Sequence, residues 1–84
     1  MLFLSRIPQY TGVEFEDFQK KLGERIQKLR ESAGVTQEKM EEGEYGIAYR
    51  TLQDIESGRS NVTLLSLYKI ARRLNIKPKD LLDI

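Results

Sequence analysis

Residues 36–58 read TQEKMEEGEYGIAYRTLQDIESG, and this stretch decides the fold. Thr36 is a good N-cap residue and predicts a short helix from residue 37 to about residue 42. A turn with two glycines follows, and a further helix is predicted over about residues 48–57, where Gly58 stops it. A short helix, a glycine-bearing turn and a second helix form the helix-turn-helix pattern.

An amphipathic stripe precedes this segment. Its apolar residues recur at steps of three and four, which is the spacing of one helix face: Phe15, Phe18, Leu22, Ile26, Leu29 and Ala33. The stripe predicts a long helix that begins near Val13, or near Gln19 if Gly23 shortens it. Gly34 suits the end of this helix because glycine adopts a positive φ at low cost.

The two ends of the chain complete the organisation. Residues 1–12, MLFLSRIPQYTG, lack helical periodicity and are predicted to form an arm, so that residues 13–84 make one domain. Thr63 is expected to cap a fourth helix and Asn75 to end it. Pro78 suits the first position of a short fifth helix. The sequence therefore predicts an all-α fold.

Composition excludes several classes of function. The chain has 84 residues, with no His and no Cys, so no thiolate or imidazole is available for catalysis or for zinc binding. We predict that the protein is not an enzyme and that it needs no metal or cofactor. The longest apolar run, Met1–Leu4, is too short to span a bilayer and lacks the features of a signal peptide, so we expect no membrane association and a cytoplasmic location.

The charged residues are distributed unevenly. The net charge is only +1, from 14 Lys and Arg against 13 Asp and Glu. Residues 22–46 carry four positive and six negative charges, whereas residues 47–84 carry seven positive and four negative charges. The basic C-terminal half is compatible with a polyanionic partner. Arg72 and Arg73, within this half, are predicted to be solvated.

Three strings carry a resemblance to a known family: Leu22-Gly-Glu-Arg-Ile, Gly34-Val-Thr-Gln-Glu and Ile55-Glu-Ser-Gly. Over about residues 20–83 the chain resembles the lambda-repressor-like helix-turn-helix domain of phage repressors, Cro proteins and Xre-type regulators. Within that family it is most similar to restriction-modification controller proteins. The resemblance implies a five-helix domain with an N-terminal arm or an extended first helix, whose helix at about 48–57 enters the DNA major groove.

The resemblance also assigns roles to individual residues. It implies that Gln37 contacts a phosphate and that Arg30 and Glu56 form a structural ion pair. The remaining implied DNA-binding residues lie on the recognition helix or in the loop that follows it: Tyr49, Arg50, Thr51, Gln53, Asp54, Arg59, Ser60 and Asn61. Asp54 is expected to orient Arg50 at the i,i+4 spacing or to form a solvated salt bridge with it.

Three features depart from the family pattern. The chain has one extra residue between Met40 and Gly46, which we expect Gly43 to absorb. Glu41 replaces a small Ala between two closely packed helices, so its side chain must extend outward or the helices must separate. Ala48 replaces a capping Ser or Thr, a loss of ~1 kcal/mol.

The resemblance predicts a sequence-specific regulator of transcription that binds double-stranded DNA as a homodimer. The predicted dimer surface is the fifth helix, with Ile76 and residues 81–84, together with the apolar arm. Two alternatives retain the fold. One is a protein-interaction module that has lost its DNA face, which the acidic second helix would favour. The other is an antitoxin that binds both its toxin, through residues 1–21, and its own operator.

Overall fold

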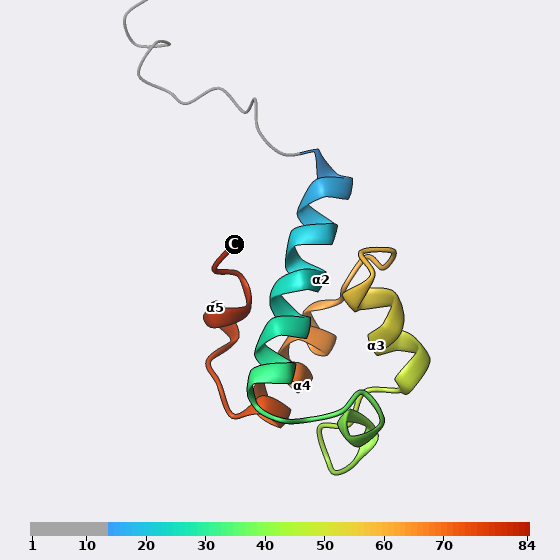
Figure 1. Cartoon of the computed structure of the whole chain (residues 1–84), viewed down its shortest axis with the longest axis vertical. Coiled ribbons are helices and arrows are strands. Elements are labelled where there is room, and N and C mark those ends of the chain that lie inside the picture. The colour runs from blue at the N-terminus through green and yellow to red at the C-terminus, as the bar shows by residue number, and fades with distance from the viewer. Residues whose placement is uncertain (1–13) are drawn as a thin grey trace, which may run out of the picture.

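The computed structural model describes residues 14–84, so the predicted arm at residues 1–12 lies outside the described residues. The described part is all-α (Figure 1). It contains four α-helices and one 3-10 helix: α2 (Phe15–Ser32), η1 (Glu38–Glu41), α3 (Tyr49–Glu56), α4 (Leu64–Leu74) and α5 (Pro78–Leu81). No helix within residues 14–84 is both long enough and apolar enough to cross a membrane.

The long helix α2 forms as its stripe predicts, but it packs along only part of its length. It begins at Phe15, so the alternative start near Gln19 is wrong. Leu22 and Ile26 are buried, whereas Phe15 and Phe18 are 53% and 39% exposed. The N-terminal turns of α2 extend beyond the other helices (Figure 1). Periodicity places Phe15 and Phe18 on the correct face, but nothing in residues 14–84 buries them.

The second predicted helix is shorter and tighter than expected, which corrects the five-helix prediction. Only Glu38–Glu41 is helical, and it is a 3-10 helix. Gly43, which we expected to absorb the extra residue, lies in this turn with φ of +85°. The Gly46 N–H then bonds back to the Gly43 carbonyl (3.2 Å), and the Ile47 N–H bonds to the Met40 carbonyl (2.8 Å). Because these bonds fold the chain back on η1, no room remains for a further helical turn.

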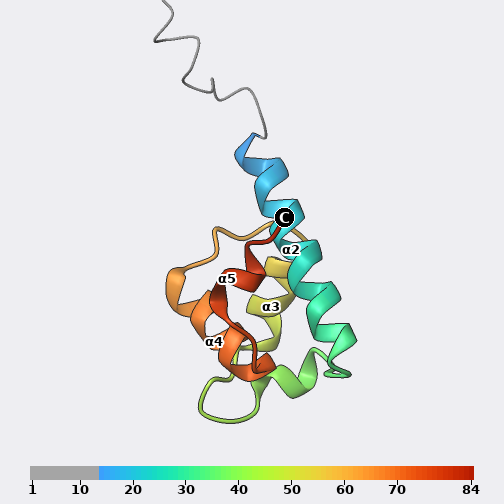
Figure 2. The ribbon, with the colours of Figure 1, turned by 90° about the vertical axis from the view of Figure 1, so that its left-hand side faces the viewer.

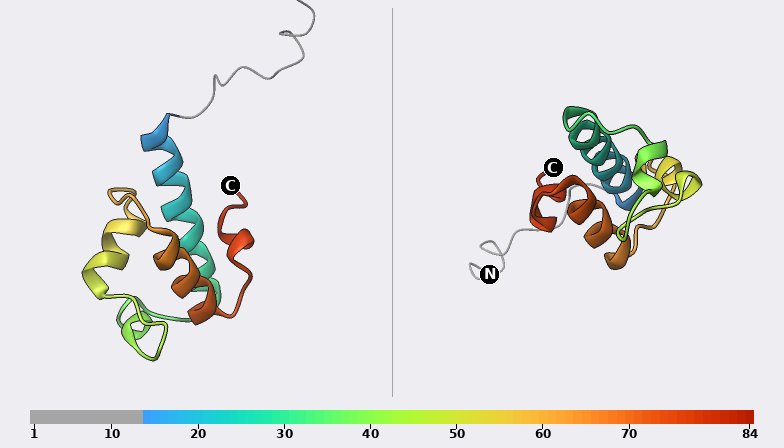
Figure 3. Two further views of the ribbon diagram at one scale, coloured as in Figure 1. Left: turned by 180° about the vertical axis from the view of Figure 1, so that it is seen from behind. Right: turned by 90° about the horizontal axis from the view of Figure 1, so that it is seen from below.

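The C-terminal helices end where the sequence predicts. Thr63 caps α4 by accepting a hydrogen bond from the Ser66 N–H (3.0 Å), and Asn75 ends it with φ of 58°. Seen from behind, α4 lies across α2 between α3 and α5 (Figure 3). Helix α5 and the chain after it lie beside α2 (Figure 2), and the Arg25 guanidinium of α2 donates to the Asp80 carbonyl of α5 at 2.9 Å.

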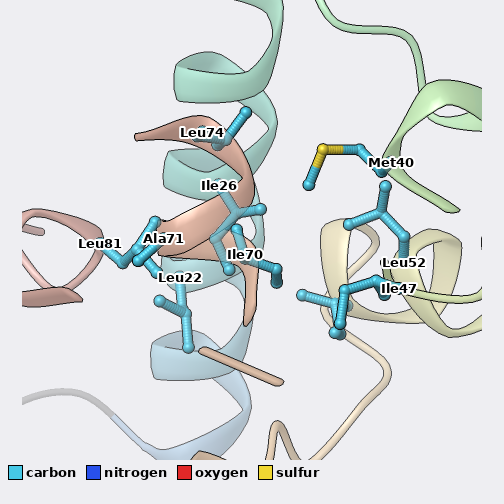
Figure 4. Packing of buried hydrophobic residues seen from close by; sticks show 10 residues of the cluster. Leu22, Ile26, Met40, Ile47, Leu52, Ile70, Ala71, Leu74 and Leu81 are labelled. Carbon is cyan, nitrogen blue, oxygen red and sulfur yellow. The ribbon is translucent and has the colours of Figure 1, made fainter. Parts of the chain in front are cut away.

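The core lies where the helices meet (Figure 4). Its buried residues come from every helix and from the turn before α3: Leu22, Ile26, Met40, Ile47, Leu52, Ile55, Ile70, Ala71, Leu74 and Leu81. Leu52 and Ile55 anchor the inner face of α3, so the opposite face of this helix is left toward solvent. Burial of one apolar face fixes the rotation of α3 and therefore decides which of its polar side chains point outward.

Candidate nucleic-acid interface

The structure brings most of the predicted DNA-binding residues together on one helix and its following loop. Five of them lie on α3: Tyr49, Arg50, Thr51, Gln53 and Asp54. The other three, at positions 59–61, follow Gly58, whose positive φ of +78° ends the helical region. Gln37 is apart from this set, because it precedes η1.

Arg50 is the most exposed charged side chain of α3. Its side chain is 84% exposed, and its nearest ionic partner is Asp54, at 3.8 Å between Nε and Oδ1. The same Asp54 oxygen accepts a shorter hydrogen bond, 3.1 Å, from the Arg59 guanidinium. Asp54 therefore does approach Arg50, as predicted, but it binds Arg59 more closely. Its carboxylate links α3 to the loop that follows.

The other predicted DNA-binding residues of α3 and its following loop either bond to a neighbouring residue or are exposed. The Gln53 amide donates to the Tyr49 hydroxyl (2.9 Å), so these two residues form one polar pair along α3. Thr51 and Asn61 are exposed. The Ser60 carbonyl accepts a hydrogen bond from the Gln19 amide of α2 (2.8 Å), which fixes the loop against the long helix.

A buried ion pair fastens α3 to α2. The Arg30 guanidinium donates to both carboxylate oxygens of Glu56, at 2.7 and 3.1 Å, and both residues are buried. Arg30 also donates to the Val35 carbonyl at 2.7 Å. The hydrogen bond with Glu56 raises the pKa of Arg30. A bidentate ion pair of this kind fixes both the distance and the relative orientation of the two side chains, and so of α2 and α3.

Gln37 belongs to this ion pair rather than to the open surface. Its amide donates to Oε1 of Glu56 at 2.9 Å, and its side chain is partly buried. The predicted contact between Gln37 and a phosphate therefore requires the amide to leave Glu56, or the backbone at the start of η1 to make the contact instead. Sequence spacing could not show this bond, because 19 residues separate its partners.

Both α4 arginines were predicted to be solvated; Arg72 is exposed, whereas Arg73 is partly buried, so the prediction is wrong for Arg73. The Arg72 guanidinium lies over the Tyr45 ring, at 4.7 Å from its centre, and donates to the Tyr68 hydroxyl at 3.0 Å. The bond to Tyr68 raises the pKa of Arg72. Arg73 donates to the Lys39 carbonyl at 2.8 Å and so ties η1 to α4. Both arginines brace the turn that leads into α3.

The sequence did not predict that Glu41 contacts the start of α3. The carboxylate of Glu41 accepts a hydrogen bond from the Tyr49 backbone N–H at 3.0 Å. Glu41 thus extends outward from η1, one of the two predicted outcomes, but it ends on the first residue of α3. Within residues 14–84, His, Cys, Asp and Glu form no group that could hold a metal ion.

Comparison with known proteins finds similarity to helix-turn-helix proteins. Residues 23–83 match a family model described as a helix-turn-helix domain. An uncharacterised HTH-type transcriptional regulator, y4dJ, from Sinorhizobium fredii is 34% identical over 65 residues, which are 77% of this chain and 83% of that protein. The control protein C.BamHI from Bacillus amyloliquefaciens is 37% identical over 62 residues, which are 73% of this chain and 75% of that protein.

The chain is also similar to a solved structure in both sequence and fold. That structure is of the restriction-modification controller protein C.AhdI from Aeromonas hydrophila, with a TM-score of 0.68 and 32% sequence identity. The match covers 75% of this chain and 94% of that protein. The resemblance to controller proteins that the sequence suggested is therefore confirmed in both sequence and structure.

Proposed function

This chain belongs to the helix-turn-helix family of transcriptional regulators, and we propose that it reads a specific sequence of double-stranded DNA with the exposed face of α3. One observation carries the proposal: α3 is fixed from behind by buried Leu52, Ile55 and Glu56, while Arg50 is 84% exposed on its outer face. An α-helix fits the major groove, and an arginine on it can bind two acceptors of one guanine.

The loop after α3 supplies the contacts that do not depend on sequence. Arg59, Ser60 and Asn61 lie next to the recognition helix, and the side chain of Arg59 is 67% exposed. Phosphate contacts fix the register of a protein on DNA, whereas contacts to base edges select the sequence. We assign the first role to Arg59 and the second to Arg50. Asp54, which holds both guanidinium groups in the free protein, would release them as DNA takes its place.

The two roles predict different losses on substitution. Arg50→Ala should lower the preference for a selected sequence over a scrambled duplex by ~1–3 kcal/mol, because it removes a base contact. Arg59→Ala should weaken both duplexes alike and reduce the salt dependence of binding, because it removes a phosphate contact. The selected sequence comes from a random duplex library, and fluorescence anisotropy at two salt concentrations measures both variants.

The outcomes separate the possibilities. If Arg50→Ala keeps the parent's ratio of specific to scrambled affinity, Arg50 is not the reading residue. If the parent protein enriches no duplex from the library, the proposed reading of DNA is wrong. The second candidate function, a protein-interaction module or antitoxin, would then be favoured. The exposed Phe15 and Phe18, in the described part of residues 1–21, support that candidate because they offer an apolar face to a partner protein.

We further propose that the protein acts as a homodimer. A single domain buries only ~600–1,000 Å² against DNA, which is a small interface. The predicted dimer surface needs revision, because Leu81 is fully buried and Ile76 packs against the core. The exposed apolar residues of α4, together with one residue that follows α5, form the better candidate: Leu64, Leu65, Tyr68 and Leu82. Part of this surface is a groove between α4 and α5.

A charge placed on this surface tests the dimer. Leu65 is 61% exposed on α4, so Leu65→Glu should leave the fold intact while its carboxylate opposes burial in an interface. We expect Leu65→Glu to sediment as a monomer at concentrations where the parent is a dimer. Ser32→Glu, at the exposed end of α2, is the matched control. A Leu65→Glu variant with the parent's sedimentation profile would exclude this surface.

A further inference from the structure

The recognition helix α3 has no cap of its own. Ala48 occupies its N-cap position and makes no side-chain hydrogen bond. The first N–H groups of a helix have no partner within the helix and normally require a capping side chain or water. In this structure the Tyr49 N–H, the first of α3, donates to Oε2 of Glu41 at 3.0 Å. The carboxylate also carries the charge that a helix N-terminus favours.

The turn between η1 and α3 is built so that Glu41 reaches this position. A Cβ on Gly46 would clash with the Glu41 carbonyl oxygen and lie 2.8 Å from its carbonyl carbon, so the chain passes directly over the Glu41 backbone. Gly43, at φ of +85°, provides the reversal. These two glycines therefore allow the turn to bring Glu41 against the first residue of α3.

We propose that Glu41 is a positioning residue for DNA reading, which substitutes from η1 for the missing local cap of α3. The proposal rests on the proposed function, because it concerns how α3 presents its side chains to DNA. Tyr49 and Arg50 are the first two residues of α3. If the first turn of α3 unwinds, both lose their helical direction, since each helical residue turns the next by about 100°. Glu41 therefore determines where Arg50 points without touching DNA itself.

The first test needs no DNA. In Glu41→Ala the Tyr49 amide proton loses its acceptor, so its hydrogen exchange, followed by NMR, should be at least about tenfold faster than in the parent. Glu44→Ala is the matched control, because it removes the same charge from another exposed residue, three positions further along the chain. Glu41→Gln keeps an oxygen acceptor and should retain most of the protection. Equal Tyr49 exchange in Glu41→Ala and Glu44→Ala would overturn the capping role.

The second test concerns reading. We expect Glu41→Ala to lower the melting temperature by about 4–8 °C, the effect of a lost cap in a domain of this size. Measured well below that temperature, its ratio of specific to scrambled DNA affinity should fall at least about fivefold. Adding Ala48→Ser supplies a local cap, so the double variant should regain the melting temperature and the affinity ratio of the parent.

Together, the exchange, stability and DNA-affinity results distinguish the capping role of Glu41 from its positioning role. If Glu41→Ala keeps the parent's affinity ratio, or if Ala48→Ser restores stability but not the ratio, Glu41 does not position the reading residues. If the parent binds DNA without preference while Tyr49 protection still depends on Glu41, the proposed function fails and the capping role stands. Glu41→Gln with a ratio within about twofold of the parent would support positioning by the hydrogen bond rather than by charge.

Discussion

Arg30→Ala should lower the free energy of unfolding by about 3–5 kcal/mol, because it leaves the Glu56 carboxylate buried without its charged partner. Glu56 has a side chain only 4% exposed, and both of its oxygens accept hydrogen bonds from Arg30. The Gln37 amide, at 2.9 Å, cannot neutralise the charge that remains. A domain of this size is stable by only ~5–15 kcal/mol, so the variant should be close to unfolding.

Urea denaturation followed by circular dichroism measures this loss. Lys28→Ala, an exposed substitution on the same helix, is the control and should change stability by less than about 0.5 kcal/mol. Replacing both partners by apolar residues, as in Arg30→Met with Glu56→Leu, should recover much of the loss, because no buried charge is then left unpaired. A loss of less than ~1 kcal/mol for Arg30→Ala would mean that Glu56 is solvated in the native state.

The sequence predicted the parts of the fold that depend on local chemistry. Thr63 and Asn75 bound α4 as expected, because a side-chain cap and a left-handed residue act on their immediate neighbours. Gly34 follows α2 with φ of +73°, as its position indicated. The buried stripe of α2 at Leu22 and Ile26 follows from periodicity alone.

The failures of prediction involve contacts that only the folded chain creates, either within a tight turn or between segments distant in sequence. Periodicity places Phe18 in line with Leu22 but does not show that the other helices end before reaching it. The α-helix expected at 37–42 is a 3-10 helix because the turn folds back on it through the Met40 and Gly43 carbonyls. Arg73, 34 residues from its acceptor on Lys39, could not be assigned from spacing.

In the candidate site, too, some features could be predicted from the sequence and others only from the folded structure. Family resemblance was sufficient to place Arg50 and Asp54 on an exposed helix and to pair Arg30 with Glu56. It did not show that Asp54 binds Arg59 more closely than Arg50, or that Gln37 faces Glu56. These choices depend on side-chain geometry in the folded protein. The departures from the family pattern at positions 41 and 48 were visible, but only the structure shows that the Glu41 carboxylate binds the Tyr49 N–H, next to the uncapped position 48.

Gly23→Ala should destabilise the protein by about 3 kcal/mol, although Ala is the better helix former by ~1 kcal/mol. Gly23 lies in the middle of α2, where α2 packs on the end of α3. A Cβ at this position would clash with the Ile55 carbonyl oxygen and lie 2.8 Å from that of Glu56. Both obstacles are backbone atoms, so no change of rotamer relieves them, and the two helices must separate.

The sign of this effect distinguishes the two physical accounts of Gly23. If helix propensity dominated, Gly23→Ala would raise the melting temperature, whereas helix contact requires a fall. Glu24→Ala, on the exposed side of the same turn, is the control and should change stability little. Separation at Gly23 also pulls Glu56 away from Arg30, since Glu56 lies at the point of contact. The losses from Gly23→Ala and Arg30→Ala should therefore not add: combined, they should cost measurably less than their sum, because the first substitution has already weakened the ion pair that the second removes.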